Sequence, residues 1–384
     1  MKIAYVFDQV LPFSAADGEQ VMNSMSAMSK LDDVEVTLFL PASNKTTNAS
    51  ADELREYFHV DGPFKVELYH SCFPGPRILE KLAHPAVCAR FARVLKQFDL
   101  IYCRNIPVVC MALGIRMPVV MDTYRPWPLQ YPPMGHLFRA FFKNPNFLGM
   151  TYHSDYARHA YLDLGIDPEK TCIAHNGYQK DHYEPVLTRE QAREIVGLPQ
   201  NVKIAMYSGR VDLKKGLDHI LRLAEARPDI HFAFVGSRER GDFEIVAEQM
   251  ANCHIFGWKQ YGSIAPYLYA ADVLIIPPTA GPLKKAGNTV LPIKLYAYLA
   301  AGRAIYAPDA PDTAELLEHG RNAWLVKPDD DNAELSGFNE LIDNDELIHK
   351  LGAEAAKDAE NLTWDARAHI VHDFMLKRLN ARNH

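Results

Sequence analysis

The chain has 384 residues, more than one ordinary hydrophobic core accommodates, so we expect two domains. Apolar residues make up 48% of the sequence and charged residues 23%, which excludes a disordered chain. The net charge of −7 argues against a general nucleic-acid-binding protein. Six scattered cysteines without a CxxC pair indicate reduced thiols, and neither a disulfide framework nor a zinc site.

The N-terminal segment MKIAYVFDQVLPF is apolar only as far as Asp8, so it predicts a buried strand and not a signal peptide. No apolar run is long enough to span a bilayer. We therefore expect a cytoplasmic protein. A basic and aromatic segment at residues 138–143 leaves contact with the inner face of the membrane open, although a solvated helix face explains the same residues.

The first half alternates short apolar strands with helical stretches, which predicts a parallel, doubly wound sheet. A helix carrying Val21, Met25 and Met28 follows the first strand, and we interpret its methionines as core residues. The strands are expected at residues 3–7, 34–40, 64–69, 100–103, 119–122 and 148–152, and a helix at 86–97.

Loops that follow the strands of such a sheet are the usual ligand positions, and three of them hold polar residues. They contain Asp17 with Gly18, Tyr124 with Arg125, and His153. Each has a structural alternative, such as a rigid Arg-Pro-Trp-Pro turn or the cap of a helix that Ser154 or Asp155 begins. We name Asp17, Tyr124, Arg125 and His153 as candidate substrate-binding residues.

The second half repeats the strand and helix alternation. Its strands are expected at residues 204–207, 230–235, 253–256, 273–276, 304–307 and 324–326. Two consecutive parallel-sheet units predict a cleft between them as a ligand site. The last segment, 364–379, is interpreted as an amphipathic helix with Ala366, Ile370, Phe374 and Leu376 on its apolar face.

The stretch KIAMYSGRVDLKKG, residues 203–216, joins a short apolar strand to a helix through a basic loop. Ser208 and Gly209 end the strand, and the loop carries Arg210 and Lys215. A glycine lets the backbone approach a ligand closely, and the cations neutralise phosphate charge. The pattern favours a phosphate site; an ordinary loop with solvated lysines is the alternative.

Residues 281–302 form a loop followed by a helix with Pro292 in its first turn. We expect free backbone N–H groups at 289–291 to form an anion cradle. A simple helix cap without a ligand is the alternative. The candidate anion-binding residues here are Asn288, Thr289, Val290, Leu291 and Lys294, with Lys284 and Lys285 nearby.

These pieces, in this order, resemble GT-B glycosyltransferases, and among them the retaining family four (glycosyl transferases group 1). The resemblance covers roughly residues 170 to 330 and rests on HNG at 175–177, SGR at 208–210 with KG at 215–216, FVG at 234–236, Gly257, ADV at 271–273, Pro277 and the segment 292–302. It implies two Rossmann-like domains facing across a cleft. Residues 1–178 would bind the acceptor, with Asp17, Tyr124, Arg125 and His153 as the candidate acceptor residues. Residues 179–363 would bind the donor, and the 364–384 helix would pack back on the first domain.

The resemblance also implies residue roles. Arg210 and Lys215 would hold the donor diphosphate, helped by the peptide N–H groups of Val290 and Leu291. Gly257 and Trp258 lie where the nucleobase binds, and Gly18 where donor and acceptor meet. The donor would be a UDP or GDP sugar, bound as a substrate with neither a cofactor nor a metal ion. The oligomeric state is left open.

The sequence departs from the family at two glutamates around the later helix, whose places are taken by Thr289 and Ala297. The first glutamate supports charge near the sugar, whereas Thr289 offers only a hydrogen bond; the second binds ribose hydroxyls, which alanine cannot do. The histidine that the family carries in its first domain is not evident after Asp122.

Three functions remain after this departure. The first is a glycosyltransferase acting on a glycan, lipid-linked or protein acceptor. The second is a weakly active or inactive GT-B scaffold that binds a nucleotide or glycan, or supports a partner enzyme. The third is a sugar-nucleotide epimerase, whose histidine and acidic residues cannot be placed here.

Overall fold

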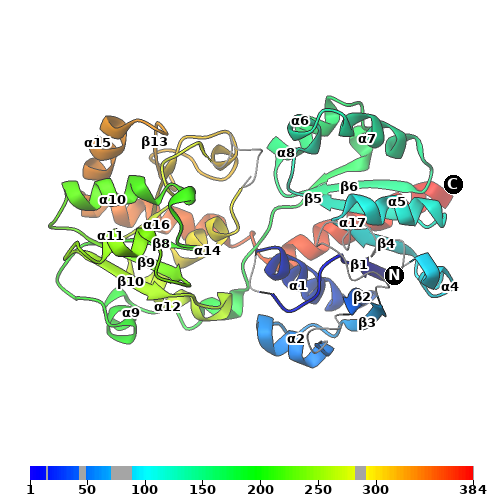
Figure 1. The fold of residues 1–384 in the computed structure, drawn as a ribbon, viewed down its shortest axis with the longest axis horizontal. Helices are drawn as coiled ribbons and strands as arrows, with labels where there is room; N and C mark the ends of the chain where they lie inside the picture. The colour runs from blue at the N-terminus through cyan, green and yellow to red at the C-terminus, as the bar shows by residue number, and fades with distance from the viewer. Residues whose placement is uncertain (14–15, 43–48, 71–88, 282–290, 384) are drawn as a thin grey trace. The chain divides into compact units, whose positions relative to one another are not determined.

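The computed structural model describes residues 1–13, 16–42, 49–70, 89–281 and 291–383, and the chain forms two compact units (Figure 1). Unit 1 comprises Met1–Asn176 and Trp364–His384, and unit 2 comprises Gly177–Thr363. The boundaries expected from the sequence lay after residues 178 and 363. Among the described residues, no helix is both long and apolar enough for a membrane span.

Unit 1 is built on a parallel seven-stranded sheet in the order β3-β2-β1-β4-β5-β6-β7. Helices α5, α7 and α8 pack on one face of the sheet, and α1 and α17 pack together in the same unit. The strands are β1 (Lys2–Val6), β2 (Glu35–Ala42), β3 (Lys65–His70), β4 (Leu100–Cys103), β5 (Val119–Thr123), β6 (Phe147–Tyr152) and β7 (Thr171–Ile173). The helices are α1 (Ala16–Ser29), α2 (Ala51–Phe58), α4 (Ala92–Leu95), α5 (Ile106–Gly114), α6 (Trp127–Gln130), α7 (Met134–Lys143), α8 (Asp155–Leu162) and α17 (Trp364–Asn383).

Unit 2 is built on a parallel six-stranded sheet in the order β10-β9-β8-β11-β12-β13. One face packs against α9, α12 and α14 and the other against α10, α11 and α15. The strands are β8 (Ile204–Ser208), β9 (His231–Ser237), β10 (Cys253–Gly257), β11 (Val273–Ile275), β12 (Ala304–Pro308) and β13 (Trp324–Val326). The helices are α9 (Arg189–Val196), α10 (Leu217–Ala226), α11 (Asp242–Ala247), α12 (Ala265–Ala270), α14 (Lys294–Ala301), α15 (Asp331–Ile342) and α16 (Asp345–Ala359).

The helix after β1 begins earlier than expected. Asp17 and Gly18 were interpreted as a loop, but both lie in the first turn of α1, where Asp17 and Glu19 place negative charge at the positive end of the helix dipole. The methionines of α1 are fully buried, which confirms their interpretation as core residues. The helix expected at 86–97 is described only from residue 89 onward, as a short 3₁₀ turn (Ala89–Phe91) and α4.

Helix α17 belongs to unit 1 although it ends the chain, and it lies beside α1 and β6 (Figure 1). Its buried apolar side chains are Trp364, Ala368, Val371, Phe374 and Met375. The apolar face assigned from the sequence was therefore partly wrong, because Ile370 and Leu376 are exposed. Buried Arg367 lies on the face that packs against the sheet, a polar residue that an apolar pattern passes over.

The aromatic residues of segment 138–143 belong to α7 and point into unit 1. Phe138 and Phe141 are buried in the core that α7 forms with the sheet, and Phe142 packs against the same core. Arg139 and Lys143 are exposed. The segment therefore has the geometry of a solvated helix face, with two of its three aromatic rings buried in the core of unit 1.

Candidate functional site

The carboxyl ends of β8 and β9 approach each other so closely that glycine is required at both. Gly209 has φ +134° and Gly236 has φ +127°, values that residues with a side chain rarely adopt. A Cβ atom on Gly236 would overlap the carbonyl oxygen of Gly209. Ser208, the last residue of β8, donates its backbone N–H to the Tyr298 hydroxyl at 2.8 Å. This part of the site is therefore a rigid surface of backbone atoms.

Two lysines lie beside this surface. Lys294, the first residue of α14, places its Nζ 3.7 Å from the centroid of the Tyr207 ring. A Cβ atom on Gly209 would come within 2.8 Å of the same Nζ. Lys215 ends the short 3₁₀ turn Leu213–Lys215 that follows β8.

The lysine pair, Lys215 with Lys294, has no carboxylate partner among the residues that the structure describes. Burial of the ammonium group, and in second place the positive charge of Lys215, hold the pKa of Lys294 well below its usual value. Two neighbouring cations without a counter-ion favour binding of an anion, which would relieve both effects.

Arg210 follows Gly209 and is an exposed cation of this loop. Its side chain is 71% exposed, and its nearest carboxylate, on Asp212, lies 3.9 Å away. The Tyr207 hydroxyl donates a hydrogen bond to the Arg210 carbonyl oxygen at 3.0 Å, which holds the backbone in place. The guanidinium group can therefore reorient toward a ligand while the loop stays fixed.

The expected anion cradle before α14 differs from the structure at Leu291. The Leu291 N–H was expected to be free, but it donates to the buried carboxylate of Asp312 at 3.2 Å. Leu291 has φ +50°, and the helix begins only at Lys294. An acid in this position satisfies the donor and would repel phosphate. Asn288, Thr289, Val290, Lys284 and Lys285 lie outside the described residues.

Ala297 occupies the place where the resemblance puts a ribose-binding glutamate. Its side chain is 4% exposed and belongs to the apolar core that α14 forms with α9 and α12. The departure from the family is thus a real loss of a polar group at this point of the helix.

Gly257 ends β10, and Trp258 follows it at the carboxyl edge of the sheet. The Trp258 N–H donates to the Ser237 carbonyl oxygen at 2.7 Å. Trp258 as a whole is 37% exposed, and the Arg238 guanidinium lies 5.4 Å from the centroid of its ring. An exposed aromatic ring at this edge can stack against a nucleobase.

In unit 1, the candidate acceptor residues gather around Arg104, which the sequence analysis did not select. Its Nη1 lies 3.5 Å from the Asp17 carboxylate, and its guanidinium lies 5.2 Å from the centroid of the Tyr124 ring. Arg125 donates its Nε–H to the Tyr124 hydroxyl at 2.8 Å and also lies over the ring of Trp127. Arg104 directly follows β4, so the rule that selected the other loops would have found it.

The fourth acceptor candidate, His153, is buried and cannot present its ring to a substrate in this conformation. It is 2% exposed and lies 2.9 Å from the Asp122 carboxylate through Nε2 and 3.3 Å from the Asn176 amide through Nδ1. Burial lowers the pKa of His153 to about 4, so its ring is neutral near pH 7. The neutral ring then donates from Nε2 to Asp122 and accepts from Asn176 at Nδ1.

The same carboxylate binds α17. Arg367 lies 2.9 Å from Asp122, and its guanidinium also donates to the Ala174 carbonyl oxygen and to Ser24. Burial alone would raise the pKa of Asp122, but His153 and Arg367 hold it well below its usual value. We call Asp122, His153 and Arg367 the buried triad of unit 1; it is a structural cluster.

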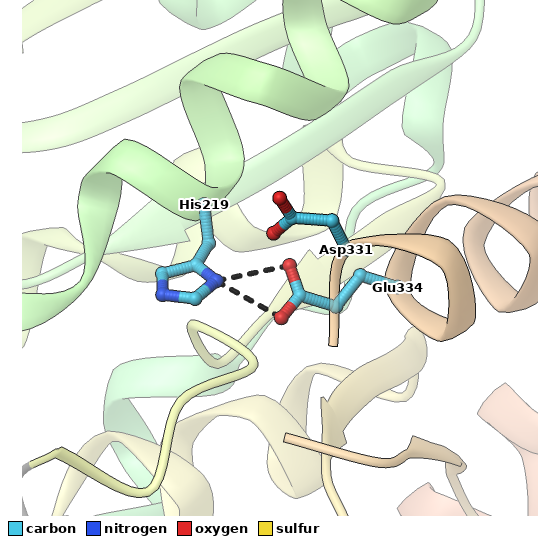
Figure 2. A group of neighbouring side chains, drawn as sticks. All are labelled: His219, Asp331 and Glu334. Carbon is cyan, nitrogen blue, oxygen red and sulfur yellow. Dashed lines mark hydrogen bonds and ion pairs between the residues drawn. The ribbon is translucent and has the colours of Figure 1, made fainter. Parts of the chain in front are cut away.

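A group of possible metal ligands in unit 2 is already neutralised. His219, Asp331 and Glu334 lie together, and the His219 Nδ1 is 2.9 Å from both carboxylate oxygens of Glu334 (Figure 2). The Arg222 guanidinium lies 3.0 Å from Asp331 and 3.8 Å from Glu334, where a metal ion would have to displace it. We interpret this group as an ion-pair network that joins α10 to α15.

Comparison with known proteins places these features in context. Residues 188–358 match the sequence family described as glycosyl transferases group 1. D-inositol 3-phosphate glycosyltransferase of Streptomyces scabiei (strain 87.22) is 25% identical over 219 residues, 53% of this chain and 47% of that protein. The chain spans about half the length of the curated relatives it matches.

Two solved structures share the fold over nearly the whole chain. Superposition with sucrose-phosphate synthase of Thermosynechococcus elongatus gives a TM-score of 0.76 at 16% sequence identity and covers 99% of each chain. Anabaena HepE, in complex with UDP and glucose, has a TM-score of 0.70 and 17% identity, and covers 98% of this chain and 99% of its own.

The fold and the sheet edges described above define a protein of the GT-B architecture, with two Rossmann-like parallel-sheet units. The match to the family described as glycosyl transferases group 1 covers residues 188–358, which lie within unit 2. The fold class and the family resemblance expected from the sequence are thereby confirmed. That the two units face each other across a cleft stays a prediction.

Proposed function

We propose that the protein is a glycosyltransferase that moves a sugar from a nucleotide diphosphate to a glycan, lipid-linked or protein acceptor. The observation that carries the proposal is the lysine pair beside the Gly209 and Gly236 backbone. It offers two amino groups, with no carboxylate partner among the described residues, next to a surface that a phosphate group can approach closely. A bound phosphate would favour the charged form of Lys294.

The site must stabilise the most charge when the bond between sugar and phosphate breaks, because the leaving diphosphate gains negative charge. We assign Lys215 and Lys294 to the neutralisation of that charge, and Arg210 to a contact that forms when the donor binds. Thr289 remains the candidate for a hydrogen bond near the sugar. With retention of configuration, as the family resemblance implies, the donor phosphate itself would accept the acceptor's proton.

We further propose a UDP-type donor, with Trp258 stacking against the base. The structural neighbour HepE was solved with UDP and glucose, which supports this choice among the nucleotides. We propose that the acceptor binds unit 1 near Asp17, Arg104, Tyr124 and Arg125.

The second candidate function is a GT-B scaffold that binds a nucleotide without efficient transfer. It is motivated by the buried Ala297, which cannot hydrogen-bond a ribose. The two candidates share the phosphate site but differ in turnover, so they are separable by experiment.

Nucleotide binding is the first test. Thermal unfolding with UDP, GDP and dTDP should show a rise in Tm with one of them, because a ligand that binds only the folded state stabilises it. Lys215→Ala should remove most of that shift, whereas Lys214→Ala should keep it, because Lys214 is an exposed neighbour in the same turn. Equal shifts in both variants would show that the lysine pair is not the phosphate site.

Turnover is the second test. Incubation with UDP-, GDP- and dTDP-sugars, with and without oligosaccharide acceptors, should release free nucleotide diphosphate when transfer or slow donor hydrolysis occurs. Binding of a nucleotide without release from any donor would favour the scaffold.

A further inference from the structure

Unit 2 contains a cavity that the proposed donor site does not use. Its volume is about 430 Å³, within the range of small-molecule sites. The residues that precede β11 and β12 contribute to its wall, so it lies at the amino edge of the sheet, opposite the edge that carries the lysine pair. The wall is formed by residues 186–190, Ala271, Asp272, 302–304, Ile348 and His349.

The one deeply buried carboxylate of the wall is already neutralised. Asp272 forms an ion pair with Arg189, and its second oxygen lies 2.7 Å from Arg193 and accepts the Ile204 N–H at 2.7 Å. Arg193 is itself saturated, because it also donates to the carbonyl oxygens of Ala270, Gln200 and Val202. Asp272 therefore has no charge left for a further cation.

Arg303 is the cation that remains. Its Nε and Nη2 groups donate to the Tyr269 carbonyl oxygen at 3.1 and 2.8 Å, and within the described part of the chain no carboxylate lies within 4.0 Å of it. Its Nη1 group makes no hydrogen bond to a described residue. Burial, together with the neighbouring charge of Arg189, lowers the pKa of Arg303.

The cavity therefore has an excess of positive charge. Arg189 lies 3.4 Å from Glu190, and Arg193, which lies behind the wall, is 2.7 Å from Asp272, so Arg303 is left without a described carboxylate of its own. Residues 188–190 bring the first turn of α9 to the wall, and the positive end of the helix dipole adds to the field.

Apart from Thr188 and His349, the rest of the wall is apolar. Val186 is 73% exposed at the rim, and Leu187, Ala271 and Ile348 line the cavity beside it. A bare inorganic ion would use Arg303 but leave this surface in water. A molecule with a charged end and an apolar body would cover both.

We propose that this cavity binds a small organic anion, a carboxylate or a phosphate monoester, whose charged group contacts Arg303 and whose apolar part lies against Val186 and Ile348. The site is independent of the transferase proposal, because it lies at the other edge of the sheet. A ligand here would contact α9, α16 and the starts of β11 and β12 at once.

Isothermal titration with benzoate, phenyl phosphate and neutral benzamide tests the proposal on the full chain. At least one of the two anions should bind, and benzamide should bind about tenfold more weakly, because it lacks the charge. Val186→Asp should weaken anion binding by about fivefold by adding a negative charge at the rim. Val186→Asn introduces a side chain with the shape of aspartate but no charge, and it should change the affinity for the anion by less than about twofold.

Arg303→Gln should abolish anion binding, and Arg240→Gln, a change at an exposed arginine of unit 2, should leave it intact. Lys215→Ala should also leave it intact, which separates this cavity from the donor site. The proposal is overturned by an absence of anion binding, by equal binding of benzamide, by loss of binding in Lys215→Ala, or by unchanged binding in Val186→Asp. Since Val186 is exposed, this last variant does not depend on how well Arg303→Gln folds.

Discussion

The lysine pair of unit 2 and the buried triad of unit 1 are both groups of titratable side chains near the carboxyl edge of a parallel sheet, but their charges are balanced differently. In the triad, Asp122 is paired with both His153 and Arg367. In the lysine pair, two cations lie near one another without a carboxylate among the described residues. A saturated cluster holds a structure together, whereas an unsaturated one is ready for a ligand.

This contrast predicts that removing a charge from the triad damages stability. Arg367→Met should lower the free energy of unfolding by about 3–5 kcal/mol, because it leaves the Asp122 carboxylate buried with one partner fewer. Denaturant unfolding followed by far-UV circular dichroism measures this change. Lys377→Met is the matched control on the same helix; its exposed pair with Glu169 should contribute no more than about 1 kcal/mol. Equal effects of the two variants would mean that Arg367 does not anchor α17.

The pH dependence of stability sharpens the same point. The pKa of His153 is about 4 in the folded protein and about 6.5 in an unfolded chain, so below pH 6.5 the unfolded state binds the extra proton. Stability should fall by about 3 kcal/mol between pH 6.5 and 4 from this residue.

The difference between wild type and His153→Gln isolates the contribution of this ring from those of the other titrating groups. The unfolding free energy of the variant should depend less steeply on pH over this range, because glutamine does not titrate. Parallel curves for the two proteins would show that His153 is protonated in the folded state.

The rate of sugar transfer tests the role proposed for the cations of unit 2. Lys215→Ala and Arg210→Ala should each reduce the rate of transfer on the order of 10²-fold, because each removes a charge that stabilises the leaving diphosphate. Steady-state release of nucleotide diphosphate measures the rate, with Lys214→Ala as the control. Unchanged kinetics in both variants would remove the catalytic assignment but leave the fold and the family as they are.

The two regions also differ in how far the sequence could predict them. The strand, glycine and basic turn at residues 204–216 were predicted correctly because their signals are local and follow one another within a few residues; their role as a phosphate site stays a prediction. The burial of His153 depends on Arg367 and Asp122, which lie 245 positions apart, and nothing in the loop after β6 announces that contact.

The same reasoning explains the incorrect expectation at Leu291. The local pattern of proline and helix-forming residues predicted free N–H groups, but the acceptor that captures one of them comes from Asp312, 21 positions later. The fold as a whole was predictable because alternating apolar strands and helices specify a parallel sheet wherever they occur. The alternation of strands and helices carries no information about contacts between side chains that are distant in the sequence.

The smallest expected effect is that of Lys294→Met. It is also the most specific, because the substitution should raise stability and lower affinity for UDP. Lys294→Met should raise the unfolding free energy of the unliganded protein by about 1 kcal/mol near neutral pH, because a partly buried cation repelled by Lys215 is removed. Affinity for UDP should fall by about tenfold, because a charge-assisted contact to phosphate is lost.

The stability gain should shrink as the pH rises toward about 10.4, because the pKa of Lys294 is lower in the folded protein and the unfolded chain binds the extra proton in that range. Calorimetric titration with UDP and denaturant unfolding at several pH values measure both parts. A variant that loses stability and binds UDP normally would identify Lys294 as a packing residue. A gain in stability together with a loss of affinity would show that Lys294 contributes to ligand binding at a cost in stability.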